Sequence, residues 1–187
     1  KGSLTSVNLE NNALGPKGAA ALAEGLKGSS TLQSLNLAGN HLCGITPWGE
    51  GTYTAEGITK LCEALKESNV TVLNLAGNHL CGICNGNQGT YTAEGITKLC
   101  EGLKGSAVTS LDLAVNHLCG VDCYGNGTYT AEGITKLCEG LKSSAVISLD
   151  LDCNQLCGLN DEGIGTYTAE GITKLCEGLK SSAVISL

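Results

Sequence analysis

The chain has 187 residues and a formal net charge of −7, with 18 acidic residues against 11 lysines and no arginine. Phosphate recognition relies on clustered lysine and arginine, so this balance argues against a nucleic-acid partner. No stretch approaches the roughly 18 consecutive apolar residues of a membrane span, so we expect no membrane insertion. Phenylalanine and methionine are absent. A core of Leu, Ile, Val, Ala and Cys suits a thin layered structure.

The first predicted element is a strand that recurs along the chain. Its motif, L-x-x-L-x-L-x-x-N-x-L with Val at some of the Leu positions, begins at residues 4, 32, 70, 108 and 146, and a further copy starts at 184. The first spacing is 28 residues and the later ones are 38. One such strand cannot bury its apolar face alone, but stacked copies form a parallel sheet with a shared core. The Asn of each motif is expected to face inward and to bind backbone groups of the turn.

A helix is predicted after each strand. The segment TYTAEGITKLCE begins at residues 52, 90, 128 and 166. Its apolar residues, beginning at Ile58, follow the i, i+3, i+4, i+7 pattern of one helical face. Thr54 is the expected N-cap, and Tyr53 is expected to pack on Ile58 as a hydrophobic staple. The recurring tyrosines are therefore interpreted as structural.

These motifs resemble the ribonuclease-inhibitor-like class of leucine-rich repeats, also found in the sensor regions of NOD-like receptors. The first repeat, which begins LTSVNLENNALGPKGAAALAEGLKGSS and spans residues 4–31, looks like a standard 28-residue member. The resemblance implies an α/β leucine-rich-repeat solenoid, a horseshoe with a parallel β-sheet on its concave face and α-helices on its convex face. It implies one domain over residues 1–187 and a role in binding rather than chemistry.

The 38-residue repeats depart from this pattern by an insertion between strand and helix. The inserted segments read GITPWGEG, GICNGNQG, GVDCYGNG and GLNDEGIG, with constant length and variable content. Loops on a rigid scaffold commonly carry recognition, although an unconstrained loop also varies, and both interpretations stay open. The candidate partner-binding residues in these loops are Trp48, Glu50, Asp122, Tyr124, Asp161 and Glu162.

The outward row of the strands supplies further candidates. It becomes acidic toward the C-terminus, which favours a basic partner, while a merely soluble sheet face is the alternative. The candidates in this row are Asn36, Asn74, Asp112, Asp150 and Asp152.

Histidines and cysteines raise the question of a metal site. His41, His79 and His117 each follow the ladder Asn and are expected to form a solvated rim, with a cysteine two residues on. A structural zinc site needs four ligands, and this pattern repeats instead of closing, so we expect no metal and no other cofactor. A second column of cysteines, expected to be free thiols on the inner helix face, comprises Cys62, Cys100, Cys138 and Cys176.

The sequence also bears on the cellular location of the protein and on whether its repeat array is capped at both ends. Buried free thiols favour a cytoplasmic location, whereas the sequons at Asn69 and Asn126 favour a secreted or cell-surface one. Neither terminal repeat carries the polar cap of a finished solenoid, so we expect a fragment of a longer repeat array.

No catalytic constellation stands outside the periodic pattern, so we expect no enzyme. The sequence instead predicts a non-catalytic scaffold that binds a protein partner through the inserted loops and the concave sheet. One alternative is a structural segment of a longer array or filament, with end-to-end or C-terminal-edge association. A second alternative is recognition of a carbohydrate or small ligand by the loops of Trp48 and Tyr124.

Overall fold

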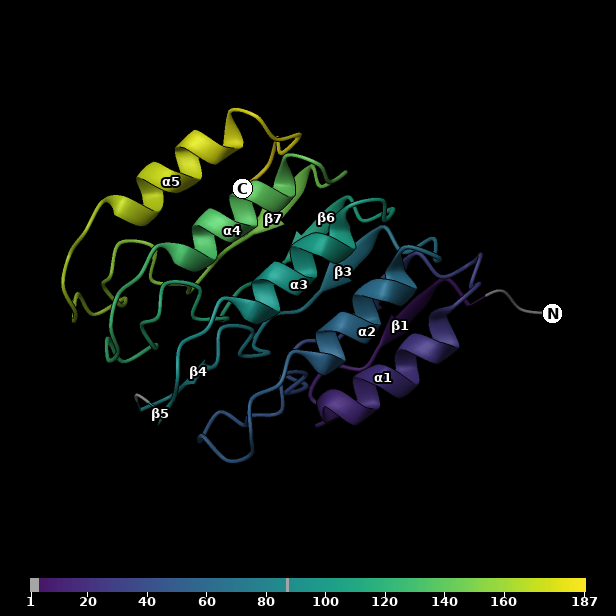
Figure 1. Cartoon of the computed structure of the whole chain (residues 1–187), viewed down its shortest axis with the longest axis horizontal. Helices are drawn as coiled ribbons and strands as arrows, with labels where there is room; N and C mark the ends of the chain where they lie inside the picture. Colours follow the sequence, from purple (N-terminus) through teal and green to yellow (C-terminus); the bar gives the residue numbers. More distant parts are fainter. Residues whose placement is uncertain (1–3, 87) are drawn as a thin grey trace.

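The structure is a computed structural model that describes residues 4–86 and 88–187. Within these residues, strands and helices alternate along the chain, and five short strands form one parallel sheet in the order β1-β2-β3-β6-β7 (Figure 1). The strands are β1 (Ser6–Asn8), β2 (Ser34–Asn36), β3 (Val72–Asn74), β6 (Ser110–Asp112) and β7 (Ser148–Asp150). The helices are α1 (Gly15–Leu26), α2 (Glu56–Leu65), α3 (Glu94–Leu103), α4 (Glu132–Leu141) and α5 (Glu170–Leu179). The expected α/β solenoid is confirmed.

The strands pair in a register that follows the sequence period. Ser6 lies opposite Ser34, Ser34 opposite Val72, and Ser110 opposite Ser148. The helices lie side by side in sequence order and cover one face of the sheet (Figure 1). Equivalent residues of successive repeats therefore form columns that run along the molecule.

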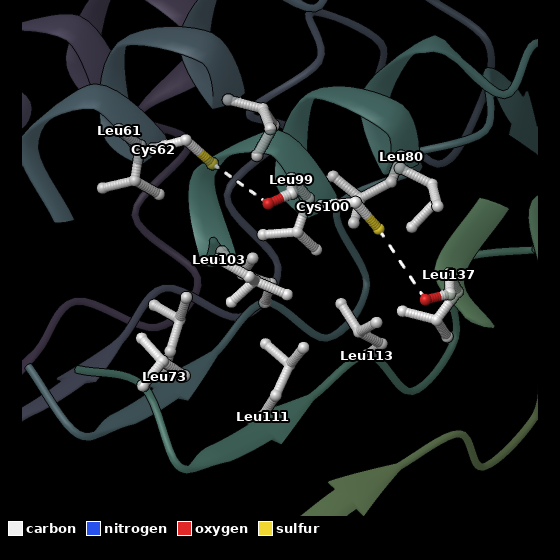
Figure 2. Packing of buried hydrophobic residues seen from close by; sticks show 14 of the residues in the cluster. Leu61, Cys62, Leu73, Leu80, Leu99, Cys100, Leu103, Leu111, Leu113 and Leu137 are labelled. Carbon is white, nitrogen blue, oxygen red and sulfur yellow. Dashed lines mark hydrogen bonds between the residues drawn. The ribbon is translucent and has the colours of Figure 1, made fainter. Parts of the chain in front are cut away.

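The core lies between these two layers. Leu73 and Leu111 point from the strands toward Leu99 and Leu103 of α3, and all four are at most 1% exposed (Figure 2). Each helix supplies the same apolar face because its apolar residues recur every three or four positions. No helix in the described part of the chain is long and apolar enough to cross a bilayer.

The ladder of asparagines is built as expected. Asn78 donates from Nδ2 to the Leu37 carbonyl at 2.9 Å, and its Oδ1 accepts from the backbone N–H groups of Asn40 and Leu42, each at 3.2 Å. One buried amide thus satisfies backbone groups of the preceding repeat, which joins neighbouring repeats through hydrogen bonds.

The start of the helices differs slightly from the prediction. Helix α2 begins at Glu56, one residue later than a Thr54 N-cap implies, although the Thr54 hydroxyl accepts from the Glu56 N–H at 3.2 Å. Tyr53, which precedes this helix, forms hydrogen bonds to the next repeat. The Tyr53 hydroxyl donates to the Leu80 carbonyl at 3.0 Å and accepts from the Gly95 N–H at 2.9 Å.

The helix cysteines pack against the next helix. Cys62, Cys100 and Cys138 are at most 9% exposed, as expected. Cys176 is exposed, so the prediction is wrong for it, because α4 is the one helix among the described residues that contacts α5. Figure 2 shows Cys62 and Cys100 directed at carbonyl groups of the following helix.

Candidate functional site

Each insertion folds into a small hairpin. In the second of them, β4 (Ile83–Cys84) pairs antiparallel with β5 (Gln88–Gly89). Single antiparallel bridges close the other three in the same way, Ile45 to Gly51, Val121 to Gly127 and Leu159 to Gly165. We call the described residues of 45–51, 83–86 with 88–89, 121–127 and 159–165 the insertion hairpins.

The second residue of each hairpin ties the two arms together. In the first, third and fourth hairpins its side-chain oxygen accepts the N–H of the residue four positions on. The pairs are Thr46 with Glu50 at 3.1 Å, Asp122 with Asn126 at 2.9 Å and Asn160 with Ile164 at 2.7 Å. In the second hairpin Cys84 Sγ donates to the Gln88 carbonyl at 3.2 Å. A short hydrogen-bonding side chain at this position is a signal that the sequence contained and our sequence interpretation missed.

The hairpins are also joined to one another. The Asn85 N–H donates to the Pro47 carbonyl at 3.1 Å, Cys123 Sγ donates to Asn85 Oδ1 at 3.3 Å, and Asn160 Nδ2 donates to the Cys123 carbonyl at 3.2 Å. Every hairpin is therefore bonded to its neighbour. The four form one connected row instead of four independent loops.

Large side chains project from this row into solvent. Trp48 is 73% exposed, Tyr124 54% and Ile164 51%. Glu50, Asp161 and Glu162 are also exposed. Five of the six hairpin candidates therefore lie in solvent. Our sequence interpretation missed Ile164, whose outward direction depends on the hairpin register.

The sixth candidate, Asp122, is wrong as a contact residue because it is fully buried. Its carboxylate accepts from the N–H groups of Tyr124 and Asn126, both at 2.9 Å, and from Asn126 Nδ2 at 3.3 Å. Asp122 therefore shapes the hairpin that presents Tyr124.

The histidines are not a solvated rim, and that expectation is also wrong. His79 is 3% exposed and His117 is fully buried. The rings stack, with centroids 6.3 Å apart between His41 and His79 and 5.7 Å apart between His79 and His117. The residues take a left-handed backbone, with φ of 53° at His79, and His79 Nδ1 lies 3.1 Å from the Ile83 carbonyl at the base of a hairpin.

Burial disfavours the protonated form of His79 and of His117. It lowers the pKa of His79 to about 4, and it lowers that of His117, where the nearby Asp122 carboxylate partly opposes the shift. Among residues 4–86 and 88–187, no group of three or more His, Cys, Asp or Glu side chains is arranged to hold a metal ion. In the His-x-Cys motifs that begin at His79 and His117, both side chains are buried.

The cysteines are all free thiols. Burial raises the pKa of Cys62 and of Cys100 to about 12, so both stay protonated at neutral pH. Cys84 is buried and closes its hairpin.

The sheet face opposite the helices, here called the open sheet face, carries the second set of candidates. Asn36, Asn74, Asp112 and Asp150 occupy the same strand position, and each accepts the N–H two residues on, at 2.8–3.0 Å. These contacts give the four residues a role in forming the turn. The fifth candidate, Asp152, is exposed just beyond β7.

A groove of about 860 Å³ lies over β3, β6 and β7 on this face. Its walls include the carboxylates of Asp112, Asp150 and Asp152. Burial raises the pKa of Asp112, and the negative charges of Asp150 and Asp152 add to that shift. The groove is therefore acidic.

Comparisons with known proteins support the fold. Family models of the leucine-rich repeat match residues 3–23 and 31–50. No curated protein sequence is significantly similar. The structure is similar to the leucine-rich repeat-containing protein LegL7 from Legionella pneumophila, with a TM-score of 0.59 and 20% identity over 93% of this chain. It is also similar to leiomodin-1 actin-binding site 2, with a TM-score of 0.57 and 15% identity over 95% of this chain. The chain spans 44% of the LegL7 chain and 79% of the leiomodin chain, and at these identities the likeness concerns the fold alone.

Proposed function

Because this chain is a leucine-rich-repeat protein, we propose that it is a non-catalytic scaffold that binds a protein partner through its insertion hairpins and its open sheet face. Leucine-rich-repeat folds generally serve as protein-binding scaffolds. One similar structure, leiomodin-1 actin-binding site 2, is by its own description a protein-binding site, which supports this use of the fold.

One observation carries the proposal, namely that variable exposed residues stand on a common, mutually bonded frame. The hairpins share their length, their closing contact and their links to neighbours, whereas the residues at their tips differ. Trp48 and Tyr124 at the tips are large aromatics exposed by more than half. Aromatic anchors of this kind dominate the energy of protein interfaces, while a constrained frame lowers the entropy cost of binding.

The small-ligand alternative receives less support. A hollow of about 410 Å³ lies between the first two hairpins, lined by Tyr53, Tyr91 and neighbouring glycines and threonines. The exposed aromatics Trp48 and Tyr124 do not line it. A small ligand there would not explain why these two residues stand in solvent.

The proposal is tested by the double variant Trp48→Ser/Tyr124→Ser. Partner capture from a lysate identifies the ligand, and its affinity is then measured with purified proteins by titration calorimetry. Loss of two aromatic anchors should weaken binding at least about 10-fold, with a shift in melting temperature of no more than about 2 °C. Tyr167→Ser is the matched control, because Tyr167 is 67% exposed but lies outside the hairpins. Unchanged affinity in the double variant would refute the role of the hairpins.

A further inference from the structure

Three histidine side chains form a column beneath the insertion hairpins. His41, His79 and His117 occupy equivalent positions of successive repeats, and their rings stack along the molecule. His79 is the middle ring and is 3% exposed. The proposed binding surface does not use these rings. In the fourth repeat Gln155 occupies the same position, so the fold also accepts a side chain there that does not titrate.

The hydrogen bond of His79 fixes which of its nitrogens carries the proton. A carbonyl oxygen can only accept, so Nδ1 carries the proton and donates to the Ile83 carbonyl at 3.1 Å. Nε2 is buried and has no hydrogen-bond partner in the described part of the chain. A second proton must therefore go to Nε2. It would create a buried donor without an acceptor, in a ring that then carries a positive charge.

The charges around His79 also oppose its protonation. The titratable groups that act on it are the neighbouring rings of His41 and His117, whose protonated forms would repel a second positive charge. Asp122, a carboxylate of the third hairpin, acts on His117 and favours the protonated form of that ring. Burial is the largest cause and lowers the pKa of His79 to about 4. The closed structure thus excludes a proton that a solvated histidine takes up near pH 6.5.

His79 supports the base of the second insertion hairpin. Its carbonyl partner, Ile83, is the first residue of that hairpin. The next residue, Cys84, closes the hairpin by donating from Sγ to the Gln88 carbonyl at 3.2 Å. If the ring of His79 leaves its site, the Ile83 carbonyl loses its donor beside this closing contact.

The second hairpin in turn joins the first hairpin to the third. The Asn85 N–H donates to the Pro47 carbonyl of the first hairpin, and Asn85 Oδ1 accepts from Cys123 Sγ of the third. The first and third hairpins carry the exposed aromatic side chains of Trp48 and Tyr124. A change at the second hairpin therefore breaks the contacts that hold these two side chains on a common frame.

We propose that the histidine column makes partner binding acid-sensitive: uptake of a proton by His79 opens the second insertion hairpin, disconnects the first and third hairpins and releases the partner. The neutral ring fits the closed hairpin, whereas the protonated ring is satisfied only where water reaches Nε2. The proton thus binds the open state better than the closed state, which is the condition for shifting the equilibrium between them. The inference rests on the proposed scaffold function and adds its regulation.

The size of the shift follows from the pKa of His79 in the two states. Between pH 7.5 and pH 5 an open hairpin with a pKa of about 6.5 takes up the proton, whereas the closed hairpin with a pKa of about 4 largely does not. The ratio of open to closed hairpin should therefore rise about 25-fold over this range. His79→Gln should abolish the rise, because glutamine does not titrate.

Opening is measured without the partner, by labelling of Cys84 with dithiodipyridine and peptide mass spectrometry. Protection is the labelling rate of the urea-unfolded chain divided by that of the native protein at the same pH. Wild-type protection of Cys84 should fall about 25-fold from pH 7.5 to pH 5, and less than about 3-fold in His79→Gln. The matched control, His41→Gln, changes the first ring of the column and should keep the wild-type fall. Cys62, buried between α2 and α3, should stay better protected than Cys84 at both pH values.

Release is measured by titration calorimetry with the purified partner at the same two pH values. Wild-type affinity should fall by about 3-fold to 25-fold at pH 5, the upper value being the full linkage to one histidine. The affinity of His79→Gln for the same partner should change less than about 2-fold. This variant also corrects for groups of the partner that titrate over this range.

The two measurements separate this inference from the proposed function. Unchanged protection of Cys84 at pH 5, an equal fall in His79→Gln, or equal protection of Cys84 and Cys62 would overturn the inference while binding through the hairpins stands. The same holds if wild-type affinity does not change with pH. If Cys84 loses protection as expected but Trp48→Ser/Tyr124→Ser retains the partner, the acid opening stands and the proposed function falls.

Discussion

At the scale of single residues, three polar side chains that the sequence suggests are exposed are buried in the interior. His79 and His117 are buried under the hairpins, and Asp122 closes its hairpin with its carboxylate. Both His79 and Asp122 lie where the chain turns, with their side chains directed inward. His79 Nδ1 lies beside the Ile83 carbonyl, and the Asp122 carboxylate accepts from the Asn126 N–H. Burial of ionisable groups makes stability depend on pH.

We expect the free energy of unfolding to fall as pH drops, because of His79. The folded pKa is about 4, below the ordinary value of about 6.5, so the unfolded chain binds a proton that the fold excludes. This contribution is fully present above about pH 6.5 and is lost as pH falls toward 4. From pH 7.5 to pH 5 the loss should be roughly 2 kcal/mol, and His79→Gln should remove it.

Urea unfolding of the wild type and of His79→Gln at pH 7.5 and pH 5 measures this loss of unfolding free energy. Glutamine is suitable because Gln155 already occupies the same column with a similar φ of 49°. The reverse change, Gln155→His, should steepen the pH dependence by lengthening the stack. The same slope in wild type and His79→Gln would contradict a neutral, buried ring.

At the scale of elements, the side chains that face each other across adjacent helices are matched in size. Side chains added at Gly102, Gly140 or Gly178 would collide with Cys62, Cys100 or Cys138 of the preceding helix. In the first helix pair the corresponding residues are Ala23 and Ala64, both buried. At each of these positions the pair is either Cys with Gly or two alanines, and the small combined volume allows close approach of the helices.

Gly140→Ala tests this match. Alanine favours an exposed helix by roughly 0.5–1 kcal/mol over glycine, yet here the added methyl meets Cys100 and should destabilise by about 1–3 kcal/mol. Cys100→Ala in the same chain should restore most of the loss, as in the natural Ala23–Ala64 pair.

The control is Gly25→Ala in α1, where the added methyl meets nothing within 4 Å and should stabilise slightly. Chemical unfolding of the three variants gives the free energies. Independent, additive effects of the Cys100 and Gly140 changes would show that the two residues do not pack together.

At the scale of the whole molecule, stability depends on bonds between repeats. The asparagine ladder, the sheet, the hairpin links and the tyrosine hydroxyls each join one repeat to the next. A solenoid of this kind behaves as a chain of nearest-neighbour interfaces. Tyr167 of the last repeat in the described part of the chain makes no such contact among the described residues and is 67% exposed.

Tyr53→Phe should therefore destabilise the fold by about 1–3 kcal/mol, because the Leu80 carbonyl and the Gly95 N–H both lose the hydroxyl. Tyr167→Phe, in the same motif, should change stability by less than about 0.5 kcal/mol. Thermal unfolding of the two variants compares them directly. Similar losses would mean that the hydroxyl does not couple the repeats.

The sequence by itself determined the strands, the helices, the inward leucines and the asparagine ladder. These follow from short-range periods of 2 and 3.6 residues and from a long repeat period, which are all visible in the letters of the chain. The exposure of Trp48 and Tyr124 was predictable for a related reason, since each lies in a variable segment between regular elements.

Only the tertiary structure decided which way the polar side chains of the turns and hairpins face. Asp122 is buried and Asp161 is exposed, although both are acids of equivalent insertions, because they occupy successive positions of the hairpin. A shift of one position reverses a side chain, and hairpin register is set by contacts that include neighbouring repeats. The pairing of cysteine with glycine has the same origin, because it joins residues about 40 positions apart that meet only after the repeats stack.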